Sequence, residues 1–186
     1  PLDNSRTIEF LTEKIKTLIL AGIYHDISKL LSKAAYYDNF EIAKLLLEKG
    51  ANPNFEKSNV LYYAVLSNNI EMVNLLFEFG ADPNAVNDAG AGPLLSAVGK
   101  GNVEIVKLLL EKGADPNAKI TRKFTSKGVV VHEGITPLIS ATFQSRDELV
   151  ELLLSKGAID FEGVAKGLAR QNNDDAIIQL LSSAKQ

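Results

Sequence analysis

The chain has 186 residues, of which 46% are hydrophobic and 23% charged, a composition typical of a folded protein rather than a disordered one. The formal net charge of −3 gives no whole-chain attraction to nucleic acid or anionic lipid. The absence of cysteine excludes disulfides, thiolate metal sites and cysteine nucleophiles, and no apolar run approaches the ~20 residues that cross a bilayer.

The first predicted element is a helix over 12–22, which ends at Gly22. A short phrase then recurs along the chain, and its glycines are separated by 30, 33 and 44 residues. The copies are Gly50-Ala51-Asn52-Pro53-Asn54, Gly80-Ala81-Asp82-Pro83-Asn84, Gly113-Ala114-Asp115-Pro116-Asn117 and the weaker Gly157-Ala158-Ile159-Asp160. Each copy follows an acidic residue and an apolar run, over 41–47, 71–77, 104–110 and 148–154. The chain is therefore predicted to be an array of repeats.

Each apolar run predicts a buried helix that ends at the glycine. In 104–110, apolar residues occupy a stripe too wide for a helix with one neighbour, so the helix is expected to pack between helices of its own and adjacent repeats. Gly113 suits the left-handed residue that ends a helix. The Asp115-Pro116-Asn117 sequence then favours a turn, because proline cannot continue the helix.

A second, shorter helix is predicted at the start of each repeat. Thr136 before Pro137 is typical of an N-cap followed by proline in the first helical position. Ser58 or Asn59 can cap the equivalent helix of the second repeat, and Gly92 that of the third. At the end of the chain, 164–181 predicts a closing helix pair, and Asp174 and Asp175 are expected at the start of its last helix.

This pattern resembles the ankyrin repeat. The family's Gly-x-Thr-Pro-Leu-His-x-Ala phrase is matched by Gly134-Ile135-Thr136-Pro137-Leu138-Ile139-Ser140-Ala141 and, less fully, by 90–97. The family's histidine is absent, and Tyr62, Leu95 and Ile139 stand in its place. The resemblance implies an all-α solenoid of helix-turn-helix units with β-hairpin fingers, whose function is to bind another protein through a concave groove.

The repeats divide the chain into a single domain with six segments. The expected boundaries are an N-terminal cap over 1–22, repeats over 23–55, 56–85, 86–118 and 119–161, and a C-terminal cap over 162–186. The long spacing before the fourth repeat places an insert within 119–134. Two β-rich stretches, 120–125 and 129–132, flank a turn at 126–128, so this segment predicts an extended finger.

The extended finger (119–134) carries a cluster of basic residues with Glu133 as its one acid: Lys119, Arg122, Lys123 and Lys127. Two interpretations stay open at the level of sequence. The charges can serve to keep an exposed edge strand from pairing with other chains. They can also bind a partner, since insertions on one face of a solenoid are often on its binding face.

The ends of the first helices supply a second candidate surface. Alignment of the repeats makes Tyr36, Leu66, Gly99 and Phe143 equivalent, followed by Tyr37, Ser67, Lys100 and Gln144. The resemblance implies that these positions face the groove together with the finger tips. An alternative for Tyr36 and Phe143 is sideways packing against the next repeat. The predicted partner-binding residues are Tyr36, Tyr37, Leu66, Asp88, Lys100, Arg122, Lys123, Phe124, Lys127 and Phe143.

No catalytic or cofactor site is predicted. The glycines at 90–92 and 99–101 lack the spacing of nucleotide-binding loops, and His25 and His132 have no second metal ligand at helical spacing. We expect a monomer that binds a protein, with no cofactor, no metal and no transmembrane segment, and with a cytoplasmic location favoured over an exported one. Two alternatives stay open: the recognition arm of a larger enzyme or exported bacterial effector, and binding of nucleic acid or an acidic partner through the basic finger.

Overall fold

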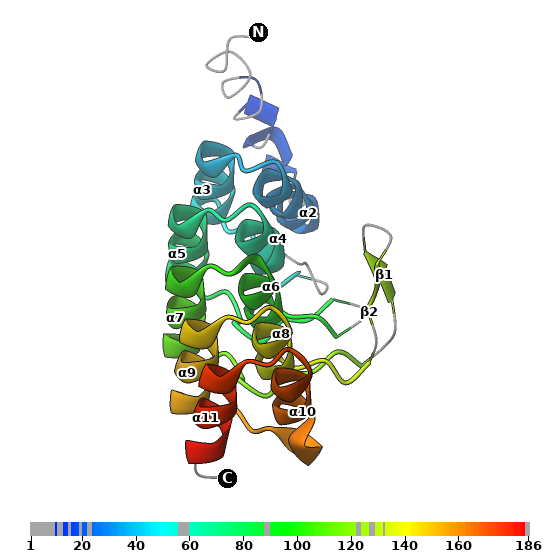
Figure 1. Ribbon diagram of the computed structural model, residues 1–186. Helices are drawn as coiled ribbons and strands as arrows, with labels where there is room; N and C mark the ends of the chain where they lie inside the picture. Colours follow the sequence, from blue (N-terminus) through cyan, green and yellow to red (C-terminus); the bar gives the residue numbers. More distant parts are fainter. Residues whose placement is uncertain are drawn as a thin grey trace, which may run out of the picture. The chain divides into compact units, whose positions relative to one another are not determined.

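The computed structural model of the chain describes residues 24–55, 60–87, 90–121, 124–126, 129–131 and 133–184, together with residues 10, 13–14, 16–18 and 20–21. The chain divides into two compact units, Pro1–Ala85 and Val86–Gln186. Within each unit, pairs of antiparallel helices are stacked on one another (Figure 1). The first and second helices of each pair are joined by a tight turn.

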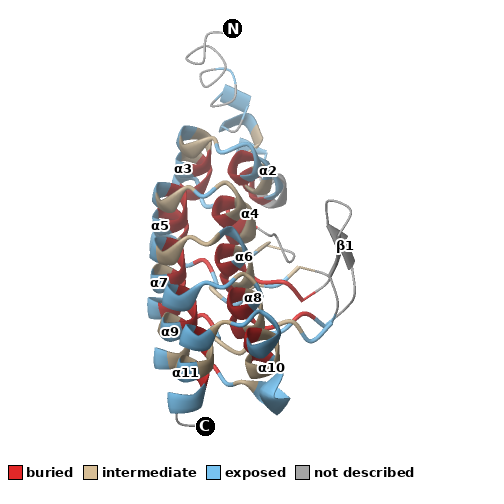
Figure 2. Ribbon diagram, viewed as in Figure 1, coloured by how far each residue is buried: buried red, intermediate tan, exposed pale blue. Residues whose placement is uncertain are grey.

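The first unit contains two complete helix pairs. They are α2 (Tyr24–Tyr36) with α3 (Phe40–Glu48), and α4 (Val60–Leu66) with α5 (Ile70–Glu78). First helix packs on first helix, α2 on α4, and α3 packs on α5. The core between the two rows contains fully buried side chains such as Ile27, Leu31, Leu46, Met72 and Leu76 (Figure 2). Within the predicted helix over 12–22, the structure describes residues 13–14, 16–18, 20 and 21. All of these are helical except Ala21, which lies in a turn.

The second unit contains three helix pairs: α6 (Pro93–Lys100) with α7 (Val103–Glu111), α8 (Pro137–Phe143) with α9 (Asp147–Ser155), and α10 (Val164–Gln171) with α11 (Asp175–Ser183). A short 3-10 turn, η2 (Phe161–Gly163), precedes α10. The first helices form one row, in which α8 contacts both α6 and α10, and α9 contacts both α7 and α11. Fully buried side chains fill the space between the rows: Ile105, Leu109, Leu138, Leu149, Leu153 and Ile177.

Left-handed glycines end the second helices, as predicted. The φ angles of Gly50, Gly80, Gly113 and Gly157 are 89°, 80°, 89° and 89°. A side chain adopts this conformation only at a cost, so the recurring glycine is explained by backbone geometry alone. The predicted cap at Thr136 is also confirmed, because its side chain accepts a hydrogen bond from the Ile139 amide at 3.2 Å.

An amide or carboxylate side chain caps the start of most second helices. The side-chain oxygens of Asn39, Asn69, Asn102 and Asp174 each accept a hydrogen bond from the backbone N–H three residues later, at 3.1, 2.9, 2.9 and 3.2 Å. The equivalent residue before α9 is Arg146, which makes no such bond. An N-cap Asn or Asp stabilises a helix by about 1 kcal/mol relative to a residue that cannot cap, so Arg146 is a departure from the structural optimum.

A backbone hydrogen bond makes the five helix pairs directly comparable. The amide of each of these N-cap residues donates to the carbonyl of a buried alanine in the preceding first helix. The alanines are Ala34, Ala64, Ala97, Ala141 and Ala169. Two residues after the first four of these alanines come Tyr36, Leu66, Gly99 and Phe143, so the alignment made from sequence is confirmed for these positions.

Asparagine side chains connect adjacent repeats within each unit. In the first unit, Asn54 donates from Nδ2 to the Gly80 carbonyl at 2.7 Å and accepts from the Asp82 amide at 2.8 Å. In the second unit, Asn117 donates to the Gly157 carbonyl at 2.9 Å and accepts from the Ile159 amide at 2.8 Å. The same bridge therefore closes intervals of 26 and 40 residues.

Strands β1 (Phe124–Ser126) and β2 (Val129–Val131) pair antiparallel within 119–134. The predicted strand over 120–125 is wrong at both ends. Ile120 and Thr121 lie outside β1, and Ser126, expected in the turn, is the last residue of β1 and pairs with Val129. The two-residue connection between them is shorter than the predicted turn over 126–128.

The base of this segment is closed by backbone bonds at Ile120. Its amide donates to the Ile135 carbonyl at 3.0 Å, and its carbonyl accepts from the Gly134 amide at 2.8 Å. The Ile120 side chain is buried. These bonds join the two ends of the segment to each other at its base, from which β1 and β2 project (Figure 1).

A buried hydroxyl in α8 leads to a stability prediction. Thr142 is fully buried, and Oγ1 has no hydrogen-bond partner among the described residues. Val65 and Val98 occupy the equivalent position in two other repeats and are also fully buried. Thr142→Val should therefore raise the free energy of unfolding by about 1 kcal/mol, because a methyl group replaces an unsatisfied polar atom. Urea denaturation followed by circular dichroism measures the change, and an unchanged or lower stability would show that the hydroxyl is satisfied.

Candidate functional site

The first unit exposes a cluster of aromatic side chains, here called the tyrosine cluster: Tyr36, Tyr37, Tyr62 and Tyr63. Tyr36 contacts Tyr37 and Tyr63 edge-on, with ring centroids 5.1 and 5.3 Å apart, and Tyr62 contacts Tyr63 at 5.8 Å. Tyr36 is 59% exposed and Tyr37 75% exposed. Edge-to-face contacts of this kind hold rings in defined positions while a large part of their surface faces water.

The ends of α2 and α4 fix the tyrosine cluster in place. The Ser67 hydroxyl lies within hydrogen-bond distance of the Tyr63 and Ala35 carbonyls, at 3.1 and 3.4 Å. Asn69 donates from Nδ2 to the Asp38 carboxylate at 2.7 Å. The rings are therefore carried by two helix ends that are hydrogen-bonded to each other, and little ordering remains to be done when a partner binds.

The two aromatic positions are both exposed. Tyr36 packs sideways, against Tyr63 of the next repeat, and remains 59% exposed. Phe143 is 70% exposed and makes no aromatic ring contact among the described residues, and its sideways packing stays a prediction. Leu66 is half-buried and Lys100 is exposed.

The other predicted contact residues belong to the extended finger and to the stretch before α6, which the structure describes only in part. Asp88, Arg122, Lys123 and Lys127 lie outside the described residues, and only the backbone of Phe124 is described, within β1. Lys119, at the base of the same segment, is exposed. The basic cluster expected in 119–134 therefore remains a prediction.

A second exposed surface, here called the Phe143 surface, lies at the ends of the first helices α6 and α8 and comprises Gly99, Lys100, Phe143 and Arg146, the N-cap residue of α9. A Cβ atom added at Gly99 would meet no atom within 4 Å, so the space there is open. The guanidinium of Arg146 lies against Gly101, where an added Cβ would be 3.1 Å from Cζ. Arg146 thus reaches back to the end of α6, next to Lys100.

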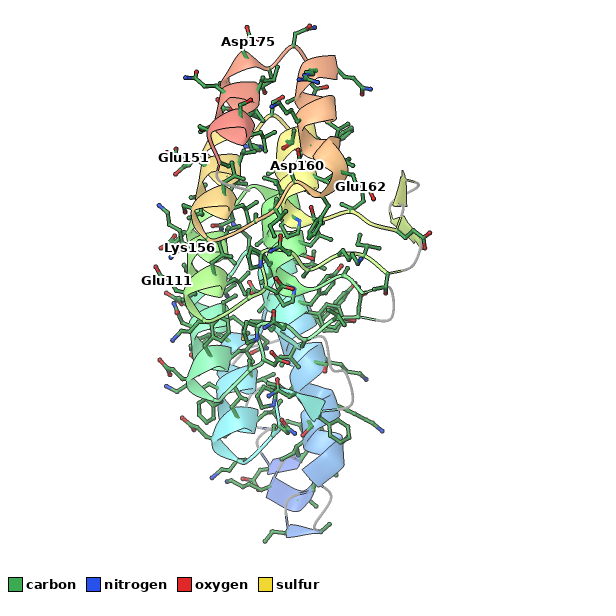
Figure 3. All side chains as sticks on the ribbon, turned by 90° about the horizontal axis from the view of Figure 1, so that it is seen from below. Glu111, Glu151, Lys156, Asp160, Glu162 and Asp175 are labelled. Atoms are coloured by element: carbon green, nitrogen blue, oxygen red, sulfur yellow. The ribbon has the colours of Figure 1, made fainter. Side chains whose placement is uncertain are left out.

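Charge is distributed unequally between the two rows of helices in the second unit. The first helices α6, α8 and α10 contain no acidic residue, and their charged residues are Lys100, Lys166 and Arg170. The second helices contain Glu104, Glu111, Asp147, Glu148, Glu151 and Asp175, and their cations are Lys107 in α7 and the C-cap residues Lys112 and Lys156 of α7 and α9. Figure 3 shows Glu111 and Glu151 projecting from the row of second helices. An acidic group would therefore be attracted to the first-helix row rather than to the second.

Neither a metal site nor a membrane span is found among the described residues. Among them, no three His, Asp or Glu side chains gather in an arrangement that could hold a metal ion. None of the helices described is long and apolar enough to cross a membrane. What these surfaces can do chemically is bury apolar rings and pair exposed charges against a partner.

Sequence reasoning missed two features of these surfaces. It named Tyr36 and Tyr37 but did not join them to Tyr62 and Tyr63 of the next repeat. It also passed over Arg146. The alignment itself held the signal for Arg146, because the equivalent residues are Asn39, Asn69, Asn102 and Asp174, and only arginine among these residue types cannot cap a helix.

Comparison with known families agrees with this architecture. The family model for ankyrin repeats (3 copies) matches residues 8–87, 31–120 and 80–164, which together cover most of the chain. No curated protein gives a significant match. The repeated helix pairs, the left-handed glycines after the second helices and the Thr136-Pro137 cap occur where the repeat pattern requires them. The chain belongs to the ankyrin-repeat family.

Proposed function

We propose that this chain binds a protein partner through the exposed ends of its first helices, with the segment 119–134 as an additional contact. Ankyrin repeats are generally protein–protein interaction modules. The observation that carries the proposal is the tyrosine cluster, in which Tyr36 and Tyr37 are 59% and 75% exposed while the aliphatic core beneath them is fully buried. A folded chain that places aromatic rings in water has a use for them at an interface.

The chemistry of the cluster suits a binding hot spot. Tyrosine offers a large apolar ring and a hydroxyl, and it loses little conformational entropy on binding because it has two side-chain torsions. The contacts of Tyr36 with Tyr37 and Tyr63 hold the rings in place before a partner arrives. Association can then proceed with a small ordering cost, which favours affinity.

The segment 119–134 supports the proposal through its position. Its base is anchored by the bonds of Ile120 to Gly134 and Ile135, and β1 pairs with β2 beyond that base. An insertion in one repeat of an array commonly adds contacts on the binding side. The proposed role of Arg122, Lys123, Phe124 and Lys127 is to supply these contacts.

Removing the two exposed rings should weaken partner binding without unfolding the chain. The partner is first retained on immobilised wild-type chain, identified by mass spectrometry and purified. The double variant Tyr36→Ala, Tyr37→Ala should then bind it about tenfold or more weakly in isothermal titration calorimetry, since truncated hot-spot residues each cost upwards of 1 kcal/mol. The thermal unfolding midpoint should change little, because both side chains are largely exposed.

Phe79→Ala provides the matched control. Phe79 is an aromatic residue of the same unit, 39% exposed, at the end of the second helix α5. Its removal should leave the affinity unchanged. Equal affinities of the wild type and the tyrosine variant, or an equal loss in both variants, would contradict the proposed binding surface.

A further inference from the structure

We infer that the Phe143 surface of the second unit binds an acidic protein segment that carries an apolar side chain. Phe143 is the apolar anchor, and Lys100 and Arg146 pair with the carboxylates beside it. The inference rests on the proposed function, because it specifies the chemistry of a partner on one of the proposed binding faces. Three independent observations lead to it.

The first observation is the identity of residue 146. In the four other helix pairs the equivalent residue is Asn or Asp and caps the second helix. Arg146 gives up that bond and places a positive charge at the positive end of the α9 dipole, where a cation is unfavourable. A residue that lowers helix stability at a position where its equivalents raise it indicates a function other than capping.

The second observation is the state of the two cations. The Arg146 guanidinium lies against Gly101, the residue that follows Lys100. Lys100 and Arg146 are both exposed, and neither side chain forms an ion pair within 4.0 Å among the described residues. Asp147 and Glu148 follow Arg146 directly in the chain but do not neutralise it at that distance. Two exposed cations without an ion pair, one of them lying against the residue that follows the other in the chain, favour a ligand that brings carboxylates.

The third observation is the exposed apolar side chain that belongs to the same surface. Phe143 is 70% exposed, and the equivalent residue of the preceding repeat is Gly99, where no side chain fills the space. Because α6 and α8 pack together, an open strip at Gly99 lies on the helix next to the one that carries Phe143. An apolar side chain of the partner can occupy that strip and be buried against the ring.

The charge distribution of the second unit favours a partner segment with negative charge. A basic segment would meet Lys100 and Arg146 on this surface and would be drawn instead to the acids of α7, α9 and α11. An acidic segment is attracted here and repelled there. Nucleic acid is a poorer match than an acidic protein, because a long phosphate chain needs a continuous basic track and the chain has a net charge of −3.

The test selects ligands without prior assumption about their charge. A library of short random peptides displayed on phage is enriched on the full chain, and the selected sequences are read. Peptides that combine Asp or Glu with a large apolar residue should dominate. The most enriched peptide is then synthesised with a fluorescent label, and its affinity for the full chain is measured by anisotropy.

Arg146→Asn separates a binding role from a structural one. The variant regains the helix cap of its equivalents, so its thermal unfolding midpoint should rise by ~2–4 °C, while its affinity for the acidic peptide should fall about tenfold. Lys100→Gln should lower the affinity in the same direction, and added NaCl should weaken wild-type binding. Lys107→Gln, which removes a cation from the second helix α7, is the control and should leave the affinity unchanged.

Several outcomes overturn the inference. These are enriched peptides without acidic residues, an affinity that Arg146→Asn leaves unchanged, or a failure of the library to yield any ligand of this surface. Binding of a labelled single-stranded oligonucleotide that is lost in Arg146→Asn would assign the surface to nucleic acid instead. The tyrosine-cluster titration tests the proposed function separately, so a protein partner that depends on Tyr36 and Tyr37 but not on Arg146 would leave that function standing.

Discussion

Gly90→Ala is expected to destabilise the second unit by about 3 kcal/mol, because strain and a steric clash act together at this residue. Gly90 has a φ of 82°, a conformation that favours glycine. An added Cβ would lie 2.5 Å from Thr121 Oγ1 and 2.9 Å from the Thr121 backbone nitrogen. The hydroxyl can rotate away, but the backbone nitrogen cannot move without shifting the base of the segment 119–134. Urea denaturation monitored by circular dichroism gives the loss.

Gly113→Ala isolates the contribution of strain. Gly113 has a similar φ of 89°, but an added Cβ would meet no atom within 4 Å. This variant should lose only the cost of the left-handed conformation, about 1 kcal/mol. Equal losses in the two variants would mean that the contact with Thr121 relaxes freely and that the close approach has no energetic weight.

Leu109→Ala should lower the free energy of unfolding by about 3–4 kcal/mol, the range observed when a buried leucine leaves a cavity. Leu109 is fully buried on α7, between the two rows of helices in the second unit. Within the unit, α7 packs against α6 and α9, which cannot collapse into the space without breaking their own contacts. The midpoint of thermal unfolding should fall accordingly.

Leu108→Ala on the same helix is the matched comparison. Leu108 is half-buried and has the same side chain, the same helix propensity and nearly the same sequence position. Its loss should be about half as large, because less surface is removed from the core. A loss at Leu108 that equals or exceeds that at Leu109 would place the packed face of α7 differently from the structure.

The helices and their ends could be predicted from the sequence because their signals are local. Glycine is the residue that takes a positive φ cheaply, so Gly50 and Gly113 mark helix ends without reference to the rest of the molecule. Proline after threonine marks the start of α8 for the same kind of reason. The repeat multiplied these signals, because a weak signal in one copy was supported by a stronger one in another.

Turns without glycine and contacts between repeats were not predicted. The left-handed turns at Asp38, Asn68 and Ser145 use residues other than glycine, so composition does not reveal them. The bridge from Asn117 to Gly157 spans 40 residues, and nothing in the local sequence says what lies beside Asn117. The strand boundary at Ser126 was misplaced because a two-residue connection and a three-residue turn have similar compositions.

The candidate surfaces were predicted in part. The alignment of repeats placed Tyr36 and Phe143 at one position of the first helix, and their exposure of 59% and 70% agrees with a surface location. The alignment could not supply the direction of each ring, because the contact of Tyr36 with the next repeat depends on the side chain that the neighbouring repeat offers. At Phe143 the preceding repeat offers Gly99, and at Tyr36 the following repeat offers Tyr63.

The asparagine bridges identify a loop whose length can change without disturbing the packing of the repeats. Asn54 and Asn117 make the same pair of bonds across 26 and 40 residues, so the register of one repeat on the next does not depend on the chain between them. Lengthening a loop whose ends are already held costs little, since closure entropy grows only with the logarithm of its length. The loop after Asn117 is therefore a natural place to graft foreign segments, and variation in recognition can accumulate there while the helical scaffold is left intact.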